Sequence, residues 1–126
     1  MLKLKIYYHH TDSGGVVYYA NYLKFLEEAR TEFFLARGIS VKELADSGTL
    51  FTVCRQEIDY KAPAFYGDTL AVDTRIAEAK GVRLVFEHEI KNQDARLICQ
   101  AKTTLACVGC DFKPKPIPDS IRNKLS

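Results

Sequence analysis

A carboxylate, two glycines and an apolar pair precede a strongly amphipathic segment near the start of the chain. The carboxylate is Asp12, the glycines are Gly14 and Gly15, and the pair is Val16 and Val17. If a helix begins just after them, its first backbone N–H groups lack partners within the helix and can stabilise developing negative charge. A carboxylate beside such donors could attack a carbonyl group or activate water for that attack. The alternative interpretation is a solvated aspartate in a glycine-containing turn, and local chemistry leaves both open.

The other reactive residue types indicate fewer kinds of site. Cys107 and Cys110 form a lone C-x-x-C, without the second ligand pair of a zinc site or the following helix of a redox pair. We therefore predict neither a metal nor a cofactor. A serine nucleophile is not expected, because the sequence contains no Gly-x-Ser-x-Gly. His9 and His88 are interpreted as structural, and His10 as an exposed strand-end residue, with participation in the chemistry as its alternative.

The bulk composition is typical of one globular domain over residues 1–126. Hydrophobic residues make up 47% of the chain and charged residues 27%. The net charge of +2 disfavours a dedicated nucleic-acid binder, which would carry a basic stripe. No stretch approaches the roughly 20 apolar residues that span a bilayer. The N-terminus alternates apolar and charged residues, unlike a signal peptide, so we expect a cytoplasmic protein.

Periodicity predicts the elements that must position Asp12. Apolar and polar residues alternate over 2–9, which predicts a half-buried strand, and a glycine-containing loop follows over 10–18. A helix is expected over 19–37, stopped by Gly38, because apolar residues recur at helical spacing. The recurring residues are Tyr22, Leu26, Ala29 and Phe33.

The rest of the chain is expected to contain one short helix followed by strands. The helix lies over 41–46, with Ser40 as its cap and Glu43 completing a capping box. A long strand is expected over 50–60. Its apolar residues fall on odd positions at Phe51 and Val53 and include an even position at Ile58, which indicates a bulge or a strong bend between them. Three further strands form an antiparallel meander over 70–76, 82–90 and 97–105. Prolines keep the tail over 113–118 extended.

This order of elements predicts an α+β fold, a five-stranded antiparallel sheet with one long helix on one face. A single helix covers only part of such a sheet. The apolar surface that remains favours a homo-oligomer, because exposed apolar patches usually mark interfaces.

Two blocks of the sequence resemble one known family. The first contains Tyr7-Tyr8, Thr11-Asp12-Ser13, Gly15-Val16-Val17-Tyr18, Ala20-Asn21-Tyr22-Leu23-Lys24-Phe25 and Glu28-Ala29-Arg30-Thr31-Glu32-Phe33-Phe34. The second contains Ile58-Asp59-Tyr60, Ala62-Pro63-Ala64 and Gly67-Asp68. In this order and spacing they resemble the hotdog-fold acyl-CoA thioesterases of the 4-hydroxybenzoyl-CoA thioesterase type. The branch they resemble most is the bacterial one associated with the Tol–Pal cell-envelope system.

The resemblance implies a hotdog fold, in which the sheet wraps around the long helix. It implies homodimers or homotetramers with active sites at the dimer interface, and hydrolysis of the thioester of acyl-coenzyme A without a metal. The catalytic carboxylate would be Asp12, as nucleophile or general base. The backbone N–H at or near Tyr19 would polarise the thioester carbonyl, and Tyr8 would shape the site.

One position departs from the family pattern. Close relatives in the Tol–Pal branch usually have a histidine where this chain has Tyr19. A phenol, with an unperturbed pKa of about 10, does not readily take a proton near pH 7, although it can donate a hydrogen bond. The backbone N–H survives the change. The departure therefore concerns proton handling, rate and substrate preference rather than carbonyl polarisation.

The substrate is expected to contact residues around the same loop and at strand ends. Val17 and Tyr18 are predicted to line the acyl pocket with Val16 and Phe51, although Val16 is favoured as a core residue. Phosphates of coenzyme A need cations. Candidates at strand ends or turns are Lys61, Lys80 and Arg83, and Ala62 and Pro63 beside Lys61 are included among the predicted substrate-binding residues.

Two other functions were weighed against thioester hydrolysis. A hotdog dehydratase is disfavoured, because no histidine lies within or after the helix before His88. A non-catalytic protein that binds acyl-CoA or acyl carrier protein remains the alternative, with Tyr19 as the reason for lost activity. An acyl carrier protein partner is compatible with either function. The acyl group and the choice between dimer and tetramer stay open.

Overall fold

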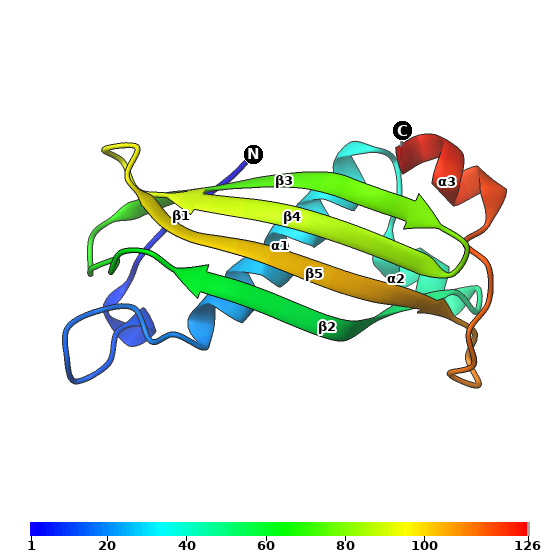
Figure 1. Cartoon of the computed structure of the whole chain (residues 1–126), viewed down its shortest axis with the longest axis horizontal. Coiled ribbons are helices and arrows are strands. Elements are labelled where there is room, and N and C mark those ends of the chain that lie inside the picture. The colour runs from blue at the N-terminus through cyan, green and yellow to red at the C-terminus, as the bar shows by residue number, and fades with distance from the viewer. Residues whose placement is uncertain (126) are drawn as a thin grey trace.

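A computed structural model describes residues 1–125, which form a five-stranded antiparallel sheet with one long helix against one face (Figure 1). The elements in chain order are β1 (Leu2–Lys5), the 3-10 helix η1 (Tyr8–His10), α1 (Asn21–Ala36), α2 (Val41–Asp46), β2 (Leu50–Tyr60), β3 (Thr69–Lys80), β4 (Arg83–Lys91), β5 (Leu97–Val108) and α3 (Asp119–Leu125). The strand order is β1-β3-β4-β5-β2, so β1 and β2 are the sheet edges. This confirms the predicted α+β fold with a sheet wrapped around a central helix.

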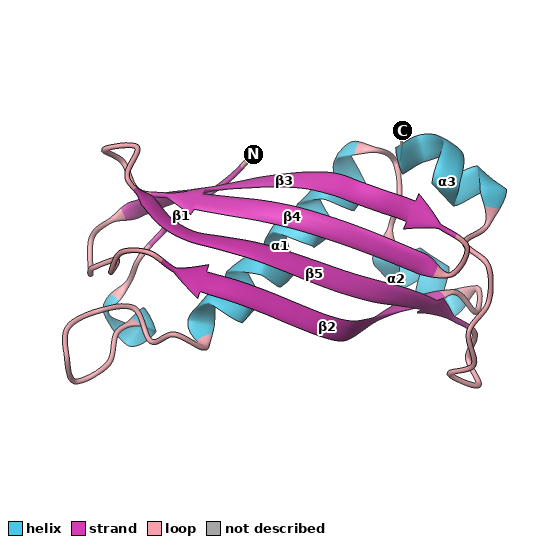
Figure 2. Ribbon diagram, viewed as in Figure 1, coloured by secondary structure: helices cyan, strands magenta, loops and turns pink. Residues whose placement is uncertain are grey.

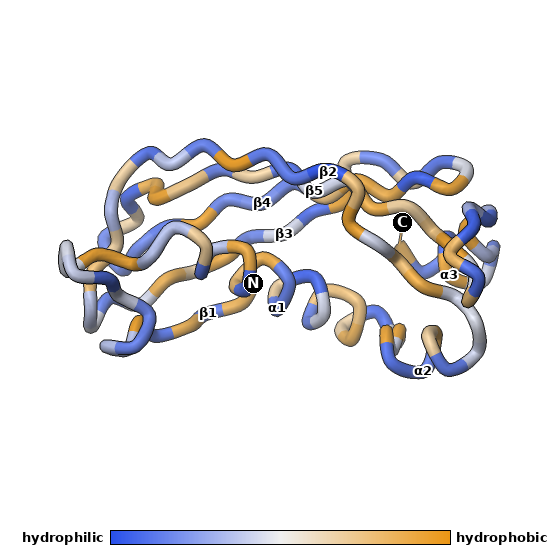
Figure 3. Tube along the Cα trace, turned by 90° about the horizontal axis from the view of Figure 1, so that it is seen from below, coloured by the Kyte–Doolittle hydropathy of each residue, from blue (hydrophilic) through white to orange (hydrophobic). Residues whose placement is uncertain are grey.

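The core lies between α1 and the concave face of the sheet (Figure 3). Toward its N-terminus, α1 buries Tyr22, Phe25 and Leu26 in a first cluster with side chains of the sheet such as Leu70 and Ile98. Toward its C-terminus, it buries Phe34 in a second cluster that contains the following residues: Ile39, Leu84, Phe86, Leu105, Cys107, Ile117, Ile121 and Leu125. The amphipathic stripe of the helix thus joins two apolar clusters along its length.

The long strand and the meander were predicted correctly. β2 spans the expected residues, and its register shifts between Val53 and Arg55, which confirms the expected bulge. The Sγ of Cys54, the residue at the shift, donates to the Thr104 carbonyl at 3.4 Å. β3, β4 and β5 pair consecutively and antiparallel, as Figure 2 shows. Ser40 caps α2 by accepting from the Glu43 N–H at 3.2 Å, but the described bonds hold only this half of the predicted capping box.

The predicted strand over 2–9 is wrong beyond Lys5, because polar groups near residue 8 capture the backbone in a 3-10 turn. The Tyr7 N–H donates to His10 Nδ1 at 2.9 Å, and the Thr11 hydroxyl donates to the Tyr8 carbonyl at 2.7 Å. Such local side-chain bonds compete with strand pairing. The turn directs the chain away from the sheet and toward the loop that carries Asp12.

The tail over 113–118, predicted to be extended, contains no helix and no named strand, and the helix that follows it was not predicted. Val108 bridges to Pro114, and α3 then begins at Asp119. Its Ile121 and Leu125 are four residues apart and fill the second cluster. Within the described residues, no helix is both long enough and apolar enough to cross a membrane.

His88 is buried in β4 and faces the helix, as a structural histidine would. Its Nδ1 lies 3.0 Å from the Thr74 hydroxyl, and its Nε2 has no hydrogen-bond partner among the described residues. Burial, with a smaller effect of the Arg30 guanidinium on α1, lowers the pKa of His88 to about 4. The imidazole is therefore neutral in the folded chain at neutral pH.

This buried histidine predicts a loss of stability in acid. Between the ordinary pKa of 6.5 and about 4, the unfolded chain binds a proton at His88 that the folded chain does not. The free energy of unfolding should fall through this window as the pH falls, by up to about 3 kcal/mol. Urea unfolding at about pH 7 and about pH 4.5 should show a smaller acid loss in His88→Gln than in wild type. Equal losses in the two proteins would contradict the assignment.

Candidate active site

The Asp12 side chain is held by the turn in which it lies. The Gly15 N–H donates to the Asp12 carbonyl and the Asp12 N–H donates to the Val16 carbonyl, both at 3.0 Å. The Gly14 N–H donates to Asp12 Oδ1 at 2.8 Å. The carboxylate is thus oriented by a backbone donor while the residue stays exposed to solvent.

Both glycines of the turn are needed for its shape. Gly15 has φ +81°, a left-handed conformation that other residues adopt only with strain. Gly14 has no such φ, but a Cβ there would lie 3.2 Å from Asp12 Oδ1. A side chain at Gly14 would therefore crowd the carboxylate oxygen that its own N–H holds.

The loop is tied to α1 and to the segment after β2. The His10 carbonyl accepts from the Tyr18 N–H at 2.9 Å and from the Asn21 side-chain amide at 2.8 Å. The Val17 N–H donates to the Ala64 carbonyl at 2.8 Å. These bonds close the loop at its base and place the Asp12 turn beside the first turn of the helix.

Two backbone donors at the start of α1 are unpaired. The Asn21 N–H donates to the Tyr18 carbonyl at 2.9 Å, which begins the first helical turn. Within the described part of the chain, the N–H groups of Tyr19 and Ala20 make no hydrogen bond. Such groups carry the partial positive charge of a helix N-terminus. The helix predicted over 19–37 begins at Asn21, so Ala20 is its N-cap and Tyr19 precedes the cap. The role of the Tyr19 N–H stays a prediction.

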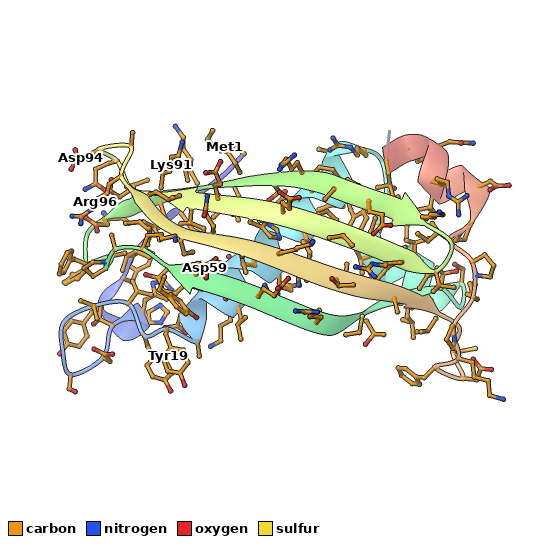
Figure 4. The ribbon with its side chains drawn as sticks, in the orientation of Figure 1. Met1, Tyr19, Asp59, Lys91, Asp94 and Arg96 are labelled. Carbon is orange, nitrogen blue, oxygen red and sulfur yellow. The ribbon has the colours of Figure 1, made fainter. Side chains whose placement is uncertain are left out.

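Exposed aromatic side chains surround these donors. Tyr18 and Tyr19 have ring centroids 4.9 Å apart, and Tyr8 meets Tyr66 edge to face at 5.9 Å. Figure 4 shows Tyr19 at the start of α1, projecting away from the sheet. Neighbouring Tyr19 raises the pKa of the Tyr18 phenol, and the charge of Asp12 adds a smaller effect in the same direction. Tyr18 therefore stays a neutral hydroxyl near the carboxylate.

The predicted pocket residues are only partly gathered here. Val17 is buried in the first cluster, whereas Val16 is partly exposed, so the predicted core position of Val16 was wrong. Phe51 lies at the opposite end of β2, stacked 5.8 Å from Phe34. Phe51 therefore does not line the Asp12 site within one chain.

The predicted cations divide between the two ends of the sheet. Lys61 follows β2 at the end that carries the Asp12 loop and is exposed, as is Pro63, while Ala62 packs against the first cluster. Lys80 and Arg83 flank the β3–β4 turn at the other end (Figure 1). The structure thus brings Lys61 to the Asp12 side within one chain and leaves the other two remote.

Several residues that position the site were not singled out from the sequence. Asn21 supports the loop through His10, and the Tyr60 hydroxyl donates to the Tyr19 carbonyl at 3.2 Å. The two contacts join residues that are separated by 11 and by 41 positions in the sequence. No local spacing pattern therefore indicates them. Asp68 is a turn residue, as expected. Its carboxylate accepts from the Phe65 N–H at 2.8 Å and from the side-chain amide of Gln93 at 3.0 Å.

A comparison with protein families matches residues 8–125 to the thioesterase-like superfamily. Among curated proteins, the acyl-CoA thioester hydrolase YbgC of Escherichia coli O157:H7 is 37% identical over 119 residues, which cover 94% of this chain and 89% of that protein. The putative acyl-CoA thioesterase YneP of Bacillus subtilis is 34% identical, with 93% and 88% covered.

Solved structures show the same architecture. The 1,4-dihydroxy-2-naphthoyl-CoA thioesterase Slr0204 from Synechocystis superposes with a TM-score of 0.92 at 26% identity. The superposition covers 98% of this chain and 93% of that one. The similarity therefore extends over nearly the whole of both chains.

The conformation of Gly15 predicts a local cost of substitution. Gly15→Ala should lower the free energy of unfolding by about 1–2 kcal/mol, because alanine is strained at this φ although nothing obstructs its methyl group. Ser13→Ala, in the same turn but without a positive φ, should change it by less than about 0.5 kcal/mol. Chemical denaturation of both variants measures the difference, and equal stabilities would show that the backbone of the turn adapts.

Proposed function

The chain belongs to the thioesterase-like superfamily, and from this we propose that it hydrolyses acyl-coenzyme A at the Asp12 turn. It is an acyl-CoA thioester hydrolase, like the curated relatives it matches. One observation carries the assignment of the site: a carboxylate held by the Gly14 N–H lies in a loop whose base is bonded to a helix start with two free N–H groups. Attack on a thioester needs these two components, an oxygen that attacks or activates water and a donor for the oxyanion.

The proposed reaction begins when the thioester carbonyl oxygen accepts a hydrogen bond from the Tyr19 N–H, with that of Ala20 beside it. If Asp12 is the nucleophile, its oxygen bonds to the carbonyl carbon, the C–S bond breaks and coenzyme A leaves as thiolate. Water then hydrolyses the mixed anhydride. If Asp12 is the general base, it takes a proton from water while the water oxygen bonds to the same carbon. The C–S bond then breaks, the carboxylic acid is released, and the coenzyme A thiolate takes the proton held by Asp12. In both versions negative charge grows on the carbonyl oxygen, where one good donor is worth about 3 kcal/mol.

The Tyr19 side chain is assigned no proton transfer in this proposal. Its phenol serves as a hydrogen-bond donor or acceptor rather than as a base. The backbone donor does not depend on the side chain. We therefore assign Tyr19 its N–H, and assign Tyr8 and Tyr18 to the walls of the site, where their exposed rings can contact the acyl group.

Coenzyme A would extend from the site along charged surface. Lys61 is the exposed cation at this end of β2, and its ammonium suits a phosphate. Pro63 and Ala62 next to it would contact the pantetheine arm. The phosphates keep such substrates from crossing membranes, so a cytoplasmic location is part of the proposal.

A homo-oligomer of two or four copies is also proposed, because the free edge strand β2 and the neighbouring start of α1 expose large apolar side chains. Val53 and Tyr60 on β2 and Leu23 and Tyr19 near the adjacent flank of α1 are each more than two-fifths exposed. Unpaired edge strands and exposed apolar side chains are both disfavoured in an isolated chain. Two-fold pairing of β2 edges would cover them and enclose the open site.

The thioester carrier can be a protein as well as coenzyme A, because both present the acyl group on phosphopantetheine. Acyl carrier proteins are acidic and would need a basic surface. Lys3 and Lys91 share the convex face of the sheet, one on each side of Ala71, and Lys5 is exposed further along β1. The same face also carries Asp73 and Glu89 in the next row of the sheet, so only this corner is basic, and we propose it as the contact for an acyl carrier protein as an additional partner.

A second candidate function is binding of acyl-CoA without turnover. It is favoured by one observation, the tyrosine at position 19 where the family pattern has a histidine. The two functions differ in whether bound acyl-CoA is hydrolysed, and only hydrolysis depends on Asp12.

Asp12→Asn tests the proposed function. The amide oxygen can still accept from the Gly14 N–H, so fold and ligand binding should persist, but the group can neither attack nor take a proton. Turnover of an acyl-CoA panel, followed by thiol release, should fall by about 100-fold or more. Asp94→Asn changes an exposed carboxylate in the β4–β5 turn (Figure 4) and should leave turnover unchanged. Near-normal turnover in Asp12→Asn would remove Asp12 from the mechanism, and binding without turnover in wild type would favour the binding protein.

Val53→Asp tests the proposed interface. A charge on the free edge should dissociate the oligomer to monomers, as measured by size exclusion with light scattering, because burying an unpaired carboxylate is costly. Val41→Asp, an exposed valine at the start of α2, should leave the mass unchanged. An unaltered mass in Val53→Asp would exclude this edge as the interface.

A further inference from the structure

The Tyr60 side chain connects the sheet to the start of α1. Tyr60 is the last residue of β2, and its ring meets Tyr22 at 5.6 Å and Tyr19 edge to face at 6.4 Å. Its hydroxyl donates to the Tyr19 carbonyl oxygen at 3.2 Å. The only other donor to this oxygen in the described chain is the Tyr22 N–H, at a longer 3.4 Å. The hydroxyl is therefore the shorter of the two bonds that fix this carbonyl.

The bonded carbonyl belongs to the same peptide as a free donor. Because the peptide is planar, the Tyr19 carbonyl and the Ala20 N–H turn together, and Ala20 is one of the two residues with an unpaired N–H. A hydrogen bond received at the oxygen also polarises the amide and strengthens its N–H as a donor. The Tyr60 hydroxyl thus acts on both the direction and the strength of a donor it does not touch.

We propose that Tyr60 is a positioning residue for carbonyl polarisation, holding the Tyr19–Ala20 peptide so that the free Ala20 N–H faces the thioester oxygen beside the Tyr19 N–H. The inference rests on the proposed function and deepens it by adding a residue outside the Asp12 loop. Tyr60 contacts no reacting atom. It acts through the peptide, and its ring packing is separable from its hydroxyl.

The hydroxyl is available as a donor throughout the neutral range. Burial raises the pKa of the Tyr60 phenol, with smaller effects of Cys99 and Tyr19 in the same direction. A residue that only donates a hydrogen bond should leave the shape of the pH profile unchanged. A residue that transferred a proton in the reaction would remove one limb of the profile when substituted.

Tyr60→Phe deletes the hydroxyl and keeps the ring contacts. We expect kcat to fall about three- to tenfold, the size of one net hydrogen bond, with KM changed less than about twofold and the pH profile retained. Tyr7→Phe is the matched control: it removes a phenol of similar exposure at the same end of the molecule that makes no described contact with the Tyr19 carbonyl. It should leave kcat unchanged.

A spectroscopic measurement separates this role from a general structural one. Benzoyl-CoA and hexanoyl-CoA, each labelled with ¹³C at the thioester carbonyl, are bound to Asp12→Asn, and the carbonyl stretch is recorded by infrared difference spectroscopy. Polarisation should lower the frequency relative to free ligand, and adding Tyr60→Phe should move it part of the way back. Equal frequencies together with wild-type kcat in Tyr60→Phe would overturn the inference. Retained turnover in Asp12→Asn alone would instead overturn the proposed function, so the two failures are distinguishable.

Discussion

The carbonyl oxygen of His10 accepts two hydrogen bonds, and the position of the reactive turn depends on them. One comes from the Tyr18 N–H, where the chain leaves the Asp12 loop, and the other from the Asn21 side chain in the first turn of α1. The helix is itself fixed by the apolar side chains it buries against the sheet. The location of an exposed carboxylate is therefore set by the hydrophobic core. The connection runs through the His10 carbonyl before the turn and through Val17 after it, which is buried and donates to the Ala64 carbonyl. An acid on the surface can be placed accurately only when such a connection exists.

The parts of the fold with regular periodicity could be predicted from the sequence. α2, β2 with its bulge and the β3–β5 meander follow from local patterns of apolar residues, and the Asp12 turn and free helix donors follow from their neighbours in the chain. The end of the first strand could not be predicted. His10 and Thr11 form side-chain hydrogen bonds with the backbone at a place where alternating apolar and polar residues indicated a strand. The full set of residues that position the site could not be predicted from the sequence either. The contact of Tyr60 with Tyr19 depends on how β2 meets α1, and the remoteness of Phe51 depends on which end of a strand faces the loop.

The change at position 19 is compatible with this architecture because the donor is a backbone group. The peptide N–H is present whatever the side chain, whereas an imidazole and a phenol differ in the protons they can take. In the proposed mechanism the main chain polarises the substrate, so this side chain can vary without loss of that step. Sequence identities of 37% and 34% to the curated relatives leave room for such variation. The proposed reaction therefore assigns Tyr19 its backbone N–H and does not depend on its side chain.

The bulge in β2 has a consequence for how the chain can tolerate changes in length. Because the register shifts between Val53 and Arg55, one extra residue allows Phe51 and Ile58 to point into the same layer despite their odd separation. Removing that extra residue would make the separation even, so a regular strand would still direct both side chains into the same layer. Removing one residue elsewhere between them, with the bulge kept, would instead turn Phe51 to the convex face. A residue added to the β4–β5 turn, by contrast, extends into solvent. Insertions and deletions accepted during evolution should therefore collect in the hairpin turns and at the bulge, while the paired segments of β2 on either side of it keep their residue count.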